Sequence, residues 1–499
     1  MNHSHGYFMD STYLKHYLDG INLLDMHLSL LANQITPPPP EIENACDLGF
    51  GLGVDLNINA SGNPNTNWYG TDFNANHAHF AKDLSLKVKN NAKIYDNSFE
   101  DFLKQDLPEF DFISLQGIYS WVSPVVRQQI RDFIFKKLRL GGVVVIGYYD
   151  PFAFALRDAL RPLISHYAKD LGNLKSPEEN IQSSLGFFKD LLDLPVLEKF
   201  KNIELQSQFN NILSHNAKYL AHEHLNQSYE PFDFAKLAAE LSQAKLQFAS
   251  PANFFRLLKP SYFLDEATLN KLNETSPIMQ EMLKDLFYRV GYKKDYFIKG
   301  KTKLDSLQAE KELLKLSFIY TGKEISYKWK AMGKSFTMHQ HVYEPIFEAL
   351  KDHSIVSAQE IQDILSAQHK RKATFNELVD AIVNLKTQGS LQVAQEKSTI
   401  EQAKPSSDRF NQAIIEENQY AYYLNHLVSP ISAKGIYLNN LEMDFLYAHT
   451  RHIKDPIKWL SQKPYIKQTE QELQNALQDF EKDLPRLKKL GVIPKESKK

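Results

Sequence analysis

Short apolar runs alternate with amphipathic segments over residues 44–149. The runs suited to strands cover residues 45–49, 67–72, 93–95, 110–115 and 143–148. The last run is rich in β-branched residues, as buried parallel strands are. Helical spacing of apolar positions marks residues 76–90 and 124–138, and Gly141-Gly142 is expected to close the second helix. Strands that alternate with helices predict an α/β fold with a Rossmann-like, doubly wound sheet.

The segments on either side of this sheet have mainly helical periodicity. Residues 1–36 carry apolar side chains at helical spacing, and we expect the proline run at 37–40 to end that helix. Residues 151–225 and 231–300 are expected to be helical as well. The predicted parts are an N-terminal helical segment over 1–40, a Rossmann-like domain over 41–155 and a mostly α-helical domain over 156–310.

The segment 340–395 is typical of a winged-helix-like α(+β) arrangement. Its expected elements are helices at 343–352, 358–368 and 375–388 and a hairpin at 389–393. It carries five basic side chains (Lys351, Lys370, Arg371, Lys372 and Lys386) and seven acidic ones (Glu344, Glu348, Asp352, Glu360, Asp363, Glu377 and Asp380). A DNA-binding face should have a basic excess. We therefore expect a packing or interaction domain over 311–395 and no nucleic acid partner.

The C-terminal part looks helical after a polar connection. Residues 395–407 are polar and are expected to form a linker. Helical periodicity returns at Phe410, and the charged segment 468–490 is expected to be an exposed helix. The last predicted part is therefore a C-terminal helical region over 405–499.

Composition narrows the functional class only a little. The chain has 499 residues and a formal net charge of −2, which gives no general attraction to nucleic acid or anionic lipid. Its one cysteine, Cys46, excludes an intramolecular disulfide and a multi-cysteine zinc site. No apolar stretch reaches the roughly 20 residues of a membrane span, and Met1–Asp10 lacks a secretory pattern. We expect a cytoplasmic protein without membrane insertion.

A glycine cluster follows the first predicted strand, in the order Asp47-x-Gly49-x-Gly51-x-Gly53. Glycine lets the backbone turn tightly and come close to a ligand. The spacing differs from the dinucleotide pattern G-x-G-x-x-G. A carboxylate beside free amides suits the amino-acid end of S-adenosylmethionine, because Asp47 can meet the ammonium and the amides can meet the carboxylate.

An acidic residue and a polar turn extend this cofactor hypothesis. Asp72 ends the second strand, about 20 residues past the glycines, where a carboxylate can accept both ribose hydroxyls; a helix N-cap aspartate is the alternative. After the third strand, Asn97 or Ser98 can reach the adenine while Phe99 packs beside it, although an ordinary turn fits equally well. The expected cofactor residues are Asp47, Gly49, Phe50, Gly51, Gly53, Asp72, Phe73, Asn97, Ser98, Phe99, Gln116 and Gly117.

Aromatic side chains end the fourth and fifth strands, in residues 116–121 and 148–150. Ligands of open α/β sheets lie outside the carboxyl ends of the strands, and a sulfonium or an ammonium is attracted to aromatic faces. The expected acceptor residues are Tyr119, Trp121, Tyr148 and Tyr149. Core packing is the alternative for Tyr119 and Trp121.

Longer strings carry a resemblance to a known family. They are DLGFGLGVDLNINA (47–60), NPNTNWYGTDFNANHA (63–78), DNSFEDF (96–102), FDFISLQGIYSWVS (110–123), LGGVVVIGYY (140–149), YLAHEHLN (219–226), PFDF (231–234), DLFYRVGYKKDYFIKG (285–300) and LVSPISAKGIYL (427–438). With these strings the chain resembles class I S-adenosylmethionine-dependent methyltransferases that bear a methyltransferase regulatory domain. It is similar in particular to rickettsial protein-lysine methyltransferases of an outer-membrane surface protein.

The resemblance implies a bacterial protein-lysine N-methyltransferase with S-adenosylmethionine as its cofactor and a protein substrate. It also implies that the helical domain over 156–310 is a regulatory domain that mediates formation of a homodimer. In this domain, His222 and Glu223 would fix the helices against the cleft. A metal site at His222-Glu223-His224 is not expected, because residues two apart on a helix point in different directions.

Two segments depart from the family pattern. The family usually has histidine where this chain has Gln116, and a Tyr-Asn-Pro-Gly-Trp pattern where this chain has residues 148–154. The residues on the acceptor side thus differ from the family pattern, whereas the cofactor loop keeps it. A small-molecule or peptide methyltransferase and a non-catalytic cofactor-binding adaptor therefore stay open as alternatives.

Overall fold

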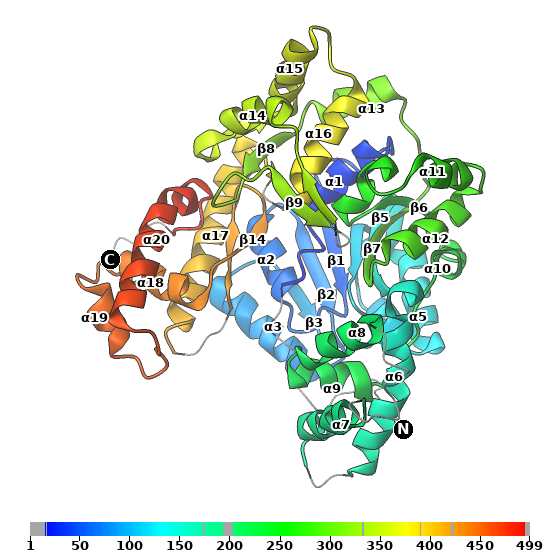
Figure 1. Cartoon of the computed structure of the whole chain (residues 1–499), viewed down its shortest axis with the longest axis vertical. Helices are drawn as coiled ribbons and strands as arrows, with labels where there is room; N and C mark the ends of the chain where they lie inside the picture. The colour runs from blue at the N-terminus through cyan, green and yellow to red at the C-terminus, as the bar shows by residue number, and fades with distance from the viewer. Residues whose placement is uncertain are drawn as a thin grey trace.

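The centre of the molecule is a seven-stranded sheet with the strand order β3-β2-β1-β4-β5-β7-β6 (Figure 1). The computed structural model describes residues 15, 17–172, 175–192, 203–331, 334–389, 391–420 and 424–494. The strands are β1 (Asn44–Leu48), β2 (Asn67–Thr71), β3 (Lys93–Tyr95), β4 (Phe110–Leu115), β5 (Leu138–Tyr149), β6 (Leu246–Pro251) and β7 (Tyr292–Lys299). β1 to β5 pair in parallel and β7 is antiparallel to both of its neighbours. The predicted doubly wound α/β sheet is confirmed.

The five strands expected from the sequence are all present, and each is largely buried except β3 at the edge of the sheet. Every residue of β1 and of β4 is buried. The connecting helices are α2 (Val54–Gly62), α3 (Ala75–Val88), α4 (Phe99–Leu103) and α5 (Pro124–Lys137). β5 begins directly after α5, so Gly141 and Gly142 lie inside the strand. The expectation that these two glycines close the helix is therefore wrong.

The prediction of helices throughout 231–300 is wrong at β6 and β7. Their neighbours are helical: α10 (Phe234–Ser242), η3 (Phe254–Leu257), η4 (Pro260–Tyr262), α11 (Glu266–Asn273) and α12 (Pro277–Tyr288). Lys293 and Asp295 give β7 a polar sequence, yet both are fully buried. Lys293 Nζ donates to Asp285 on α12 at 2.5 Å. Buried charges need such partners, and a partner on another element cannot be read from the strand's own pattern.

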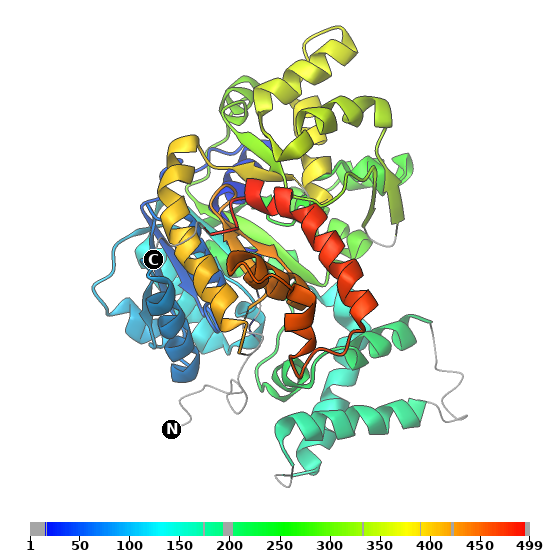
Figure 2. The ribbon, with the colours of Figure 1, turned by 90° about the vertical axis from the view of Figure 1, so that its left-hand side faces the viewer.

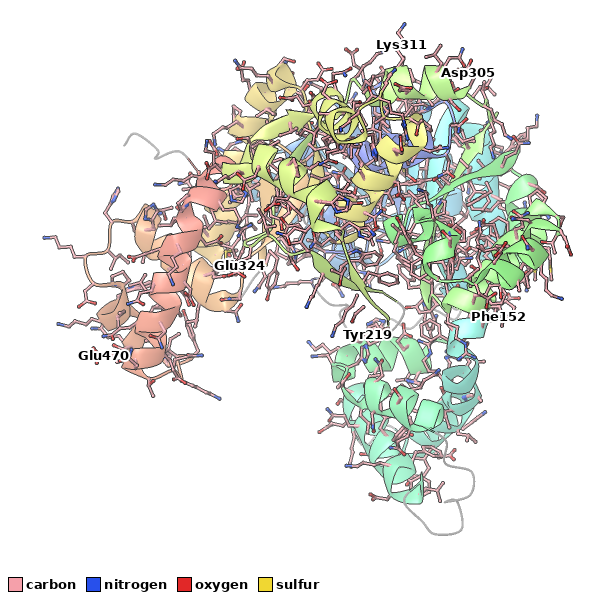
Figure 3. The ribbon with its side chains drawn as sticks, turned by 45° about the horizontal axis from the view of Figure 1, so that its top comes forward. Phe152, Tyr219, Asp305, Lys311, Glu324 and Glu470 are labelled. Atoms are coloured by element: carbon pink, nitrogen blue, oxygen red, sulfur yellow. The ribbon has the colours of Figure 1, made fainter. Side chains whose placement is uncertain are left out.

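Four helices form an arm beside the sheet: α6 (Pro151–Asp170), α7 (Pro177–Leu192), α8 (Ile203–Leu213) and α9 (Ala217–Leu225). The arm has a small core of its own, which includes Ile164, Ile181 and Phe209. Figure 3 shows it projecting from the rest of the molecule, with Phe152 and Tyr219 at the end nearest the sheet.

The N-terminal helix is shorter than predicted. α1 covers only Leu23–Ala32, because Asn22 caps its start by accepting from the Asp25 amide. It ends before the prolines, since Gln34 already has a left-handed φ of 56°. The expectation of a helix over 1–36 is therefore wrong at residues 15, 17–22 and 33–36, and residues 1–14 and 16 lie outside the described part. α1 packs Leu23 and Met26 against the sheet.

The three helices expected over 340–395 are present, but the hairpin expected at 389–393 is wrong, because residues 391–394 form a single strand that pairs with residues 317–320. The helices are α13 (Ser306–Leu313), α14 (Gln340–Ala349), α15 (Ala358–His369) and α16 (Phe375–Thr387). The strands β8 (Ser317–Tyr320), β11 (Ile355–Ser357) and β12 (Leu391–Ala394) form a small antiparallel sheet, and β9 (Lys328–Ala331) pairs with β10 (Lys334–Thr337). One hydrophobic core joins them, and it also takes Leu28 of α1.

The predicted linker at 395–407 is wrong, because α17 runs over Lys397–Glu417. Its small residues Ala403, Ser406 and Ser407 are buried, and Ser407 Oγ donates to the Ser61 carbonyl on α2 at 3.3 Å.

The fold is completed by five C-terminal elements: β13 (His426–Ser429), β14 (Lys434–Tyr437), α18 (Asn440–Thr450), α19 (Pro456–Ser461) and α20 (Glu470–Lys489). Figure 2 shows this part in orange to red. α20 is not simply exposed, since it buries Leu473, Phe480 and Leu487. No helix in the described ranges is both long and apolar enough to cross a membrane.

Candidate functional site

The loop after β1 can be made only with glycine at several positions. Gly49, Gly51 and Gly53 have φ angles of 73°, 58° and 66°. A Cβ at Gly49 would lie 2.6 Å from Ile118 Cδ1, and one at Gly53 would lie 2.5 Å from Ala81 Cβ. The positive φ angles and the close neighbours together demand glycine. The loop backbone therefore stays close to the carboxyl edge of the sheet, where the Gly49 amide donates to the Thr71 carbonyl at 2.8 Å and the Gly53 amide donates to the Phe50 carbonyl at 2.9 Å.

Asp72 holds this loop to the next one. Its Oδ2 accepts from the Gly51 amide at 2.8 Å and its Oδ1 from the Asn74 amide at 3.0 Å. His77 Nδ1 lies 3.4 Å from Oδ1. The N-cap of α3 is Asn74, whose side chain accepts from the Asn76 amide. The alternative that Asp72 caps this helix is therefore wrong.

A cavity of about 230 Å³ opens beside these loops. Its lining is Gly49, Asp72, Phe73, Asp96, Asn97, Ser98, Phe99, Ile118, Trp121, Val122, Ser123, Val126 and Gln129. Seven residues expected in the site are among them. Ser98 also caps α4, because its Oγ accepts from the Asp101 amide at 3.1 Å, so this turn is a helix cap that also lines the cavity. Four lining residues around the start of α5 were not expected from the sequence, although they closely follow Trp121: Val122, Ser123, Val126 and Gln129.

Two expected cofactor residues lie next to the cavity rather than on its wall. Asp47 is buried at the end of β1 and accepts from Ser114 Oγ. Burial, with a smaller contribution from the charge of Asp72, raises the pKa of Asp47 to about 7. Gln116 accepts from the Tyr292 hydroxyl at 3.2 Å, while its buried Nε2 has no hydrogen-bond partner among the described residues. The end of β4 thus holds a free donor.

Phe50 and Gly117 complete the expected cofactor residues, and neither lines the cavity. Phe50 packs below the loop, where a Cβ at Gly70 would lie 2.8 Å from Phe50 Cδ1. Gly117 has a φ of 65°, and a Cβ there would meet the Tyr292 hydroxyl at 3.8 Å. Both residues shape the backbone beneath the site.

The chain before α1 crosses the same edge of the sheet, which the sequence did not indicate. The Leu18 amide donates to Asp55 Oδ2 at 3.0 Å, and Lys294 donates to the carbonyl oxygens of Leu18 and Asp19 at 3.4 and 3.3 Å. A Cβ at Gly20 would lie 2.9 Å from Gln116 Oε1. Residues 17–22 therefore cover the end of β4.

Five aromatic rings meet beyond the cavity, and we call them the aromatic cluster: Trp121, Tyr149, Phe154, Tyr229 and Tyr292. The Trp121 centroid lies 5.4 Å from that of Tyr149 and 4.6 Å from that of Tyr229. The Tyr149 centroid lies 5.4 Å from those of Phe154 and Tyr292. Trp121 also lines the cavity, so it joins the two parts of the site. Phe154, Tyr229 and Tyr292 were not expected here.

Charged side chains from α6 and α9 surround the cluster. Arg157 lies within salt-bridge distance of Asp158 at 3.2 Å and of Glu223 at 3.4 Å. Tyr149 donates to Glu223 at 3.2 Å, and burial raises the pKa of Glu223 above its usual value. Asp150 caps α6 by accepting from the amides of residues 152 and 153. The rewritten segment 148–154 therefore starts the arm and contributes two rings to the cluster.

Two expected acceptor residues lie elsewhere. The Tyr148 hydroxyl donates to Asp295 at 2.6 Å in a fully buried position. The Tyr119 hydroxyl donates to Glu240 at 2.7 Å and accepts from Arg131 at 2.8 Å, and its ring is buried too. Core packing thus describes Tyr119 and Tyr148, whereas Trp121 and Tyr149 lie in the aromatic cluster.

Comparison with known proteins places the chain in a family. The Synechocystis sp. protein sll1526 is 30% identical over 514 residues, which cover 99% of this chain and 100% of that protein. The chain belongs to the same family. Residues 216–299 match the family model described as a predicted methyltransferase regulatory domain. The Rickettsia prowazekii protein RP789 is 25% identical over 46% of this chain and 41% of its own length.

A solved structure shows that the whole fold is shared. PKMT2 from Rickettsia typhi in complex with AdoHcy superposes with a TM-score of 0.72, at 15% identity, over 96% of this chain and 99% of that chain. The expected class I methyltransferase fold with a methyltransferase regulatory domain is confirmed. The regulatory-domain match spans α9 to β7 and so includes Glu223, Tyr229 and Tyr292. Residues of this domain therefore complete the aromatic cluster.

Proposed function

We propose that this family member is an S-adenosylmethionine-dependent protein methyltransferase whose acceptor is a lysine side chain of a bacterial surface protein. The observation that carries the proposal is the position of Trp121, which belongs both to the cavity at the glycine loop and to the aromatic cluster. A cofactor site and an aromatic acceptor site thus share one wall.

The residues at the cavity suit the parts of this cofactor. Asp72 borders the cavity with a carboxylate that can also accept from ribose hydroxyls, and Phe99 offers an apolar face for the adenine. The free Nε2 of Gln116 is a donor for the carboxylate of the amino-acid end, and Asp47 is the partner for its ammonium. When bound, the cofactor supplies a methyl group on a positively charged sulfur.

The chain's own groups would prepare the acceptor. The aromatic cluster excludes water and attracts a cation. The amine must lose its proton before it attacks the methyl group, and the Glu223 carboxylate, which accepts from Tyr149 beside the rings, is a group that can receive that proton. Positioning this nucleophile supplies much of the rate. The name PKMT2, borne by the R. typhi protein that was solved with AdoHcy, supports a lysine acceptor.

The first experiment is titration calorimetry of the full chain with S-adenosylhomocysteine. We expect binding, and no binding would overturn the cofactor assignment.

The second experiment uses methyl-labelled cofactor and a bacterial cell-envelope extract. Label in protein supports the proposal, and amino-acid analysis should place it on lysine. Label only in small molecules would favour the small-molecule alternative, and binding without any transfer would favour an adaptor. Light scattering would test the homodimer that we expect in a cytoplasmic enzyme.

A further inference from the structure

We infer that the aromatic cluster is a binding site for a basic side chain that the protein's own Arg157 fills and holds closed. The inference rests on the proposed function, because it names what the acceptor side recognises. It concerns α6, α9 and the carboxyl ends of β4 and β5, near the residues Phe152 and Tyr219 marked in Figure 3.

Arg157 lies among the rings in the manner of a bound cation. Its Cζ is 3.6 Å from the Phe154 centroid, 5.3 Å from that of Tyr149 and 5.9 Å from that of Tyr229. Cations within about 6 Å of a ring centroid are attracted by the ring face. A lysine ammonium would find the same three faces if the guanidinium left.

Two carboxylates complete the cation site. Arg157 Nε and Nη2 donate to Asp158 Oδ1, both at 3.2 Å, and Nη1 donates to Glu223 Oε2 at 3.4 Å. Ring hydroxyls hold these acids in place, since Tyr229 donates to Asp158 at 2.8 Å and Tyr149 to Glu223 at 3.2 Å. Aromatic faces and two carboxylates held in place together form a site that binds a positive charge.

The balance of charge requires exchange instead of addition. Arg157 pairs with Asp158 and Glu223, and the charge of Arg161 interacts with both carboxylates as well. A third cation would leave an unpaired charge in a largely buried place, which is costly. A lysine side chain can therefore enter only as Arg157 leaves.

Arg157 is the arginine that can leave. Arg161 donates to the backbone carbonyl oxygens of Glu223 at 3.0 Å and Asn226 at 2.7 Å, so it caps the end of α9. The guanidinium of Arg157 donates only to side chains within the described part of the chain, Tyr229 at 2.8 Å among them. It can turn away without breaking a backbone contact.

The test compares wild-type full chain with Arg157→Ala and Arg157→Lys. The ligands are Nα-acetyl-lysine methylamide and its uncharged counterpart Nα-acetyl-norleucine methylamide, with binding measured by ligand-observed NMR. We expect Arg157→Ala to bind the lysine ligand about tenfold more tightly than wild type does and to prefer it about tenfold over the norleucine ligand. Arg157→Lys, which refills the site with a cation, should behave like wild type.

Two results would overturn the inference. One is a folded Arg157→Ala, with the circular dichroism and melting behaviour of a native protein, that binds the lysine ligand no better than wild type does. The other is equal binding of both ligands, since that describes a mere cavity left by the deletion. If Arg157→Ala does not fold, Arg157→Met keeps the aliphatic stem and takes its place. Binding of the lysine ligand needs no cofactor. If the wild type fails to bind S-adenosylhomocysteine, the proposed function is overturned, but the comparison of the Arg157 variants can still be interpreted.

Discussion

The cofactor side and the acceptor side of this site are built in different ways. The cofactor cavity takes most of its lining from four short loops that follow β1 to β4. The aromatic cluster takes single side chains from residues 121, 149, 154, 229 and 292, which lie on the turn after β4, on β5, on the arm and in the regulatory-domain match. One side depends on backbone geometry, and the other depends on how distant elements pack.

This difference predicts how variants separate. Changes at the loops should alter cofactor affinity, whereas changes at the cluster should alter transfer at constant cofactor affinity. Trp121 is the residue common to both sides.

Asp72→Ala should cause the largest loss of cofactor affinity. It removes the carboxylate that accepts from the Gly51 amide at 2.8 Å and the Asn74 amide at 3.0 Å. Hydrogen bonds to a charged group contribute about 1.5–3 kcal/mol each, so we expect affinity for S-adenosylhomocysteine to fall roughly 100-fold. Asp106→Ala, which changes an exposed aspartate outside the cavity lining, is the control. If calorimetry finds the same affinity of Asp72→Ala and wild type for S-adenosylhomocysteine, the ribose site is elsewhere.

Cofactor affinity should rise with pH up to about 7. Burial raises the pKa of Asp47 to about 7, so the free site is protonated below that pH. An ammonium favours the ionised carboxylate and lowers its pKa, so binding releases a proton. Affinity should therefore increase by up to about tenfold per pH unit below 7 and level off above it. Calorimetry at pH 6, 7 and 8 measures this slope, and Asp47→Asn should flatten it. A slope that survives in Asp47→Asn would assign the proton to another group.

Gly147→Ala should disturb the boundary between the two sides. A Cβ there would lie 2.0 Å from the Tyr292 hydroxyl and 2.9 Å from Gln116 Oε1. Overpacking of this kind costs about 1–3 kcal/mol of stability, and it should move Tyr292 off Gln116, with several-fold slower transfer. Urea unfolding and a transfer assay measure both effects. Gly186→Ala is the control, since a Cβ there meets nothing within 4 Å. An equal stability for Gly147→Ala and wild type would mean that Tyr292 is placed differently.

The same contrast explains what the sequence could predict. β1 to β5, the glycine loop, Asp72 and residues 97–99 were predictable because each is a local pattern. β6, β7 and α17 were not, since Lys293 and Asp295 make a buried strand look polar, and Ser406 and Ser407 make a packed helix look like a linker. Tyr229 and Tyr292 reach the cluster only through the packing of distant elements, for which no local pattern exists.

Tyr148→Phe should have the smallest effect on function, although the sequence favoured Tyr148 as an acceptor residue. Successive side chains of a strand point to opposite faces, and so Tyr149 joins the aromatic cluster while Tyr148 reaches Asp295 at 2.6 Å. Losing this bond to a buried carboxylate should lower stability by about 1.5–3 kcal/mol.

Cofactor affinity and transfer by Tyr148→Phe should stay within about twofold of wild type when assayed well below the melting temperature. Tyr149→Phe, the matched change on the other face, removes the donor to Glu223 and should slow transfer. If Tyr148→Phe instead slowed transfer without losing stability, the acceptor would approach the sheet from the face of Asp295, and the aromatic cluster would no longer mark the acceptor side.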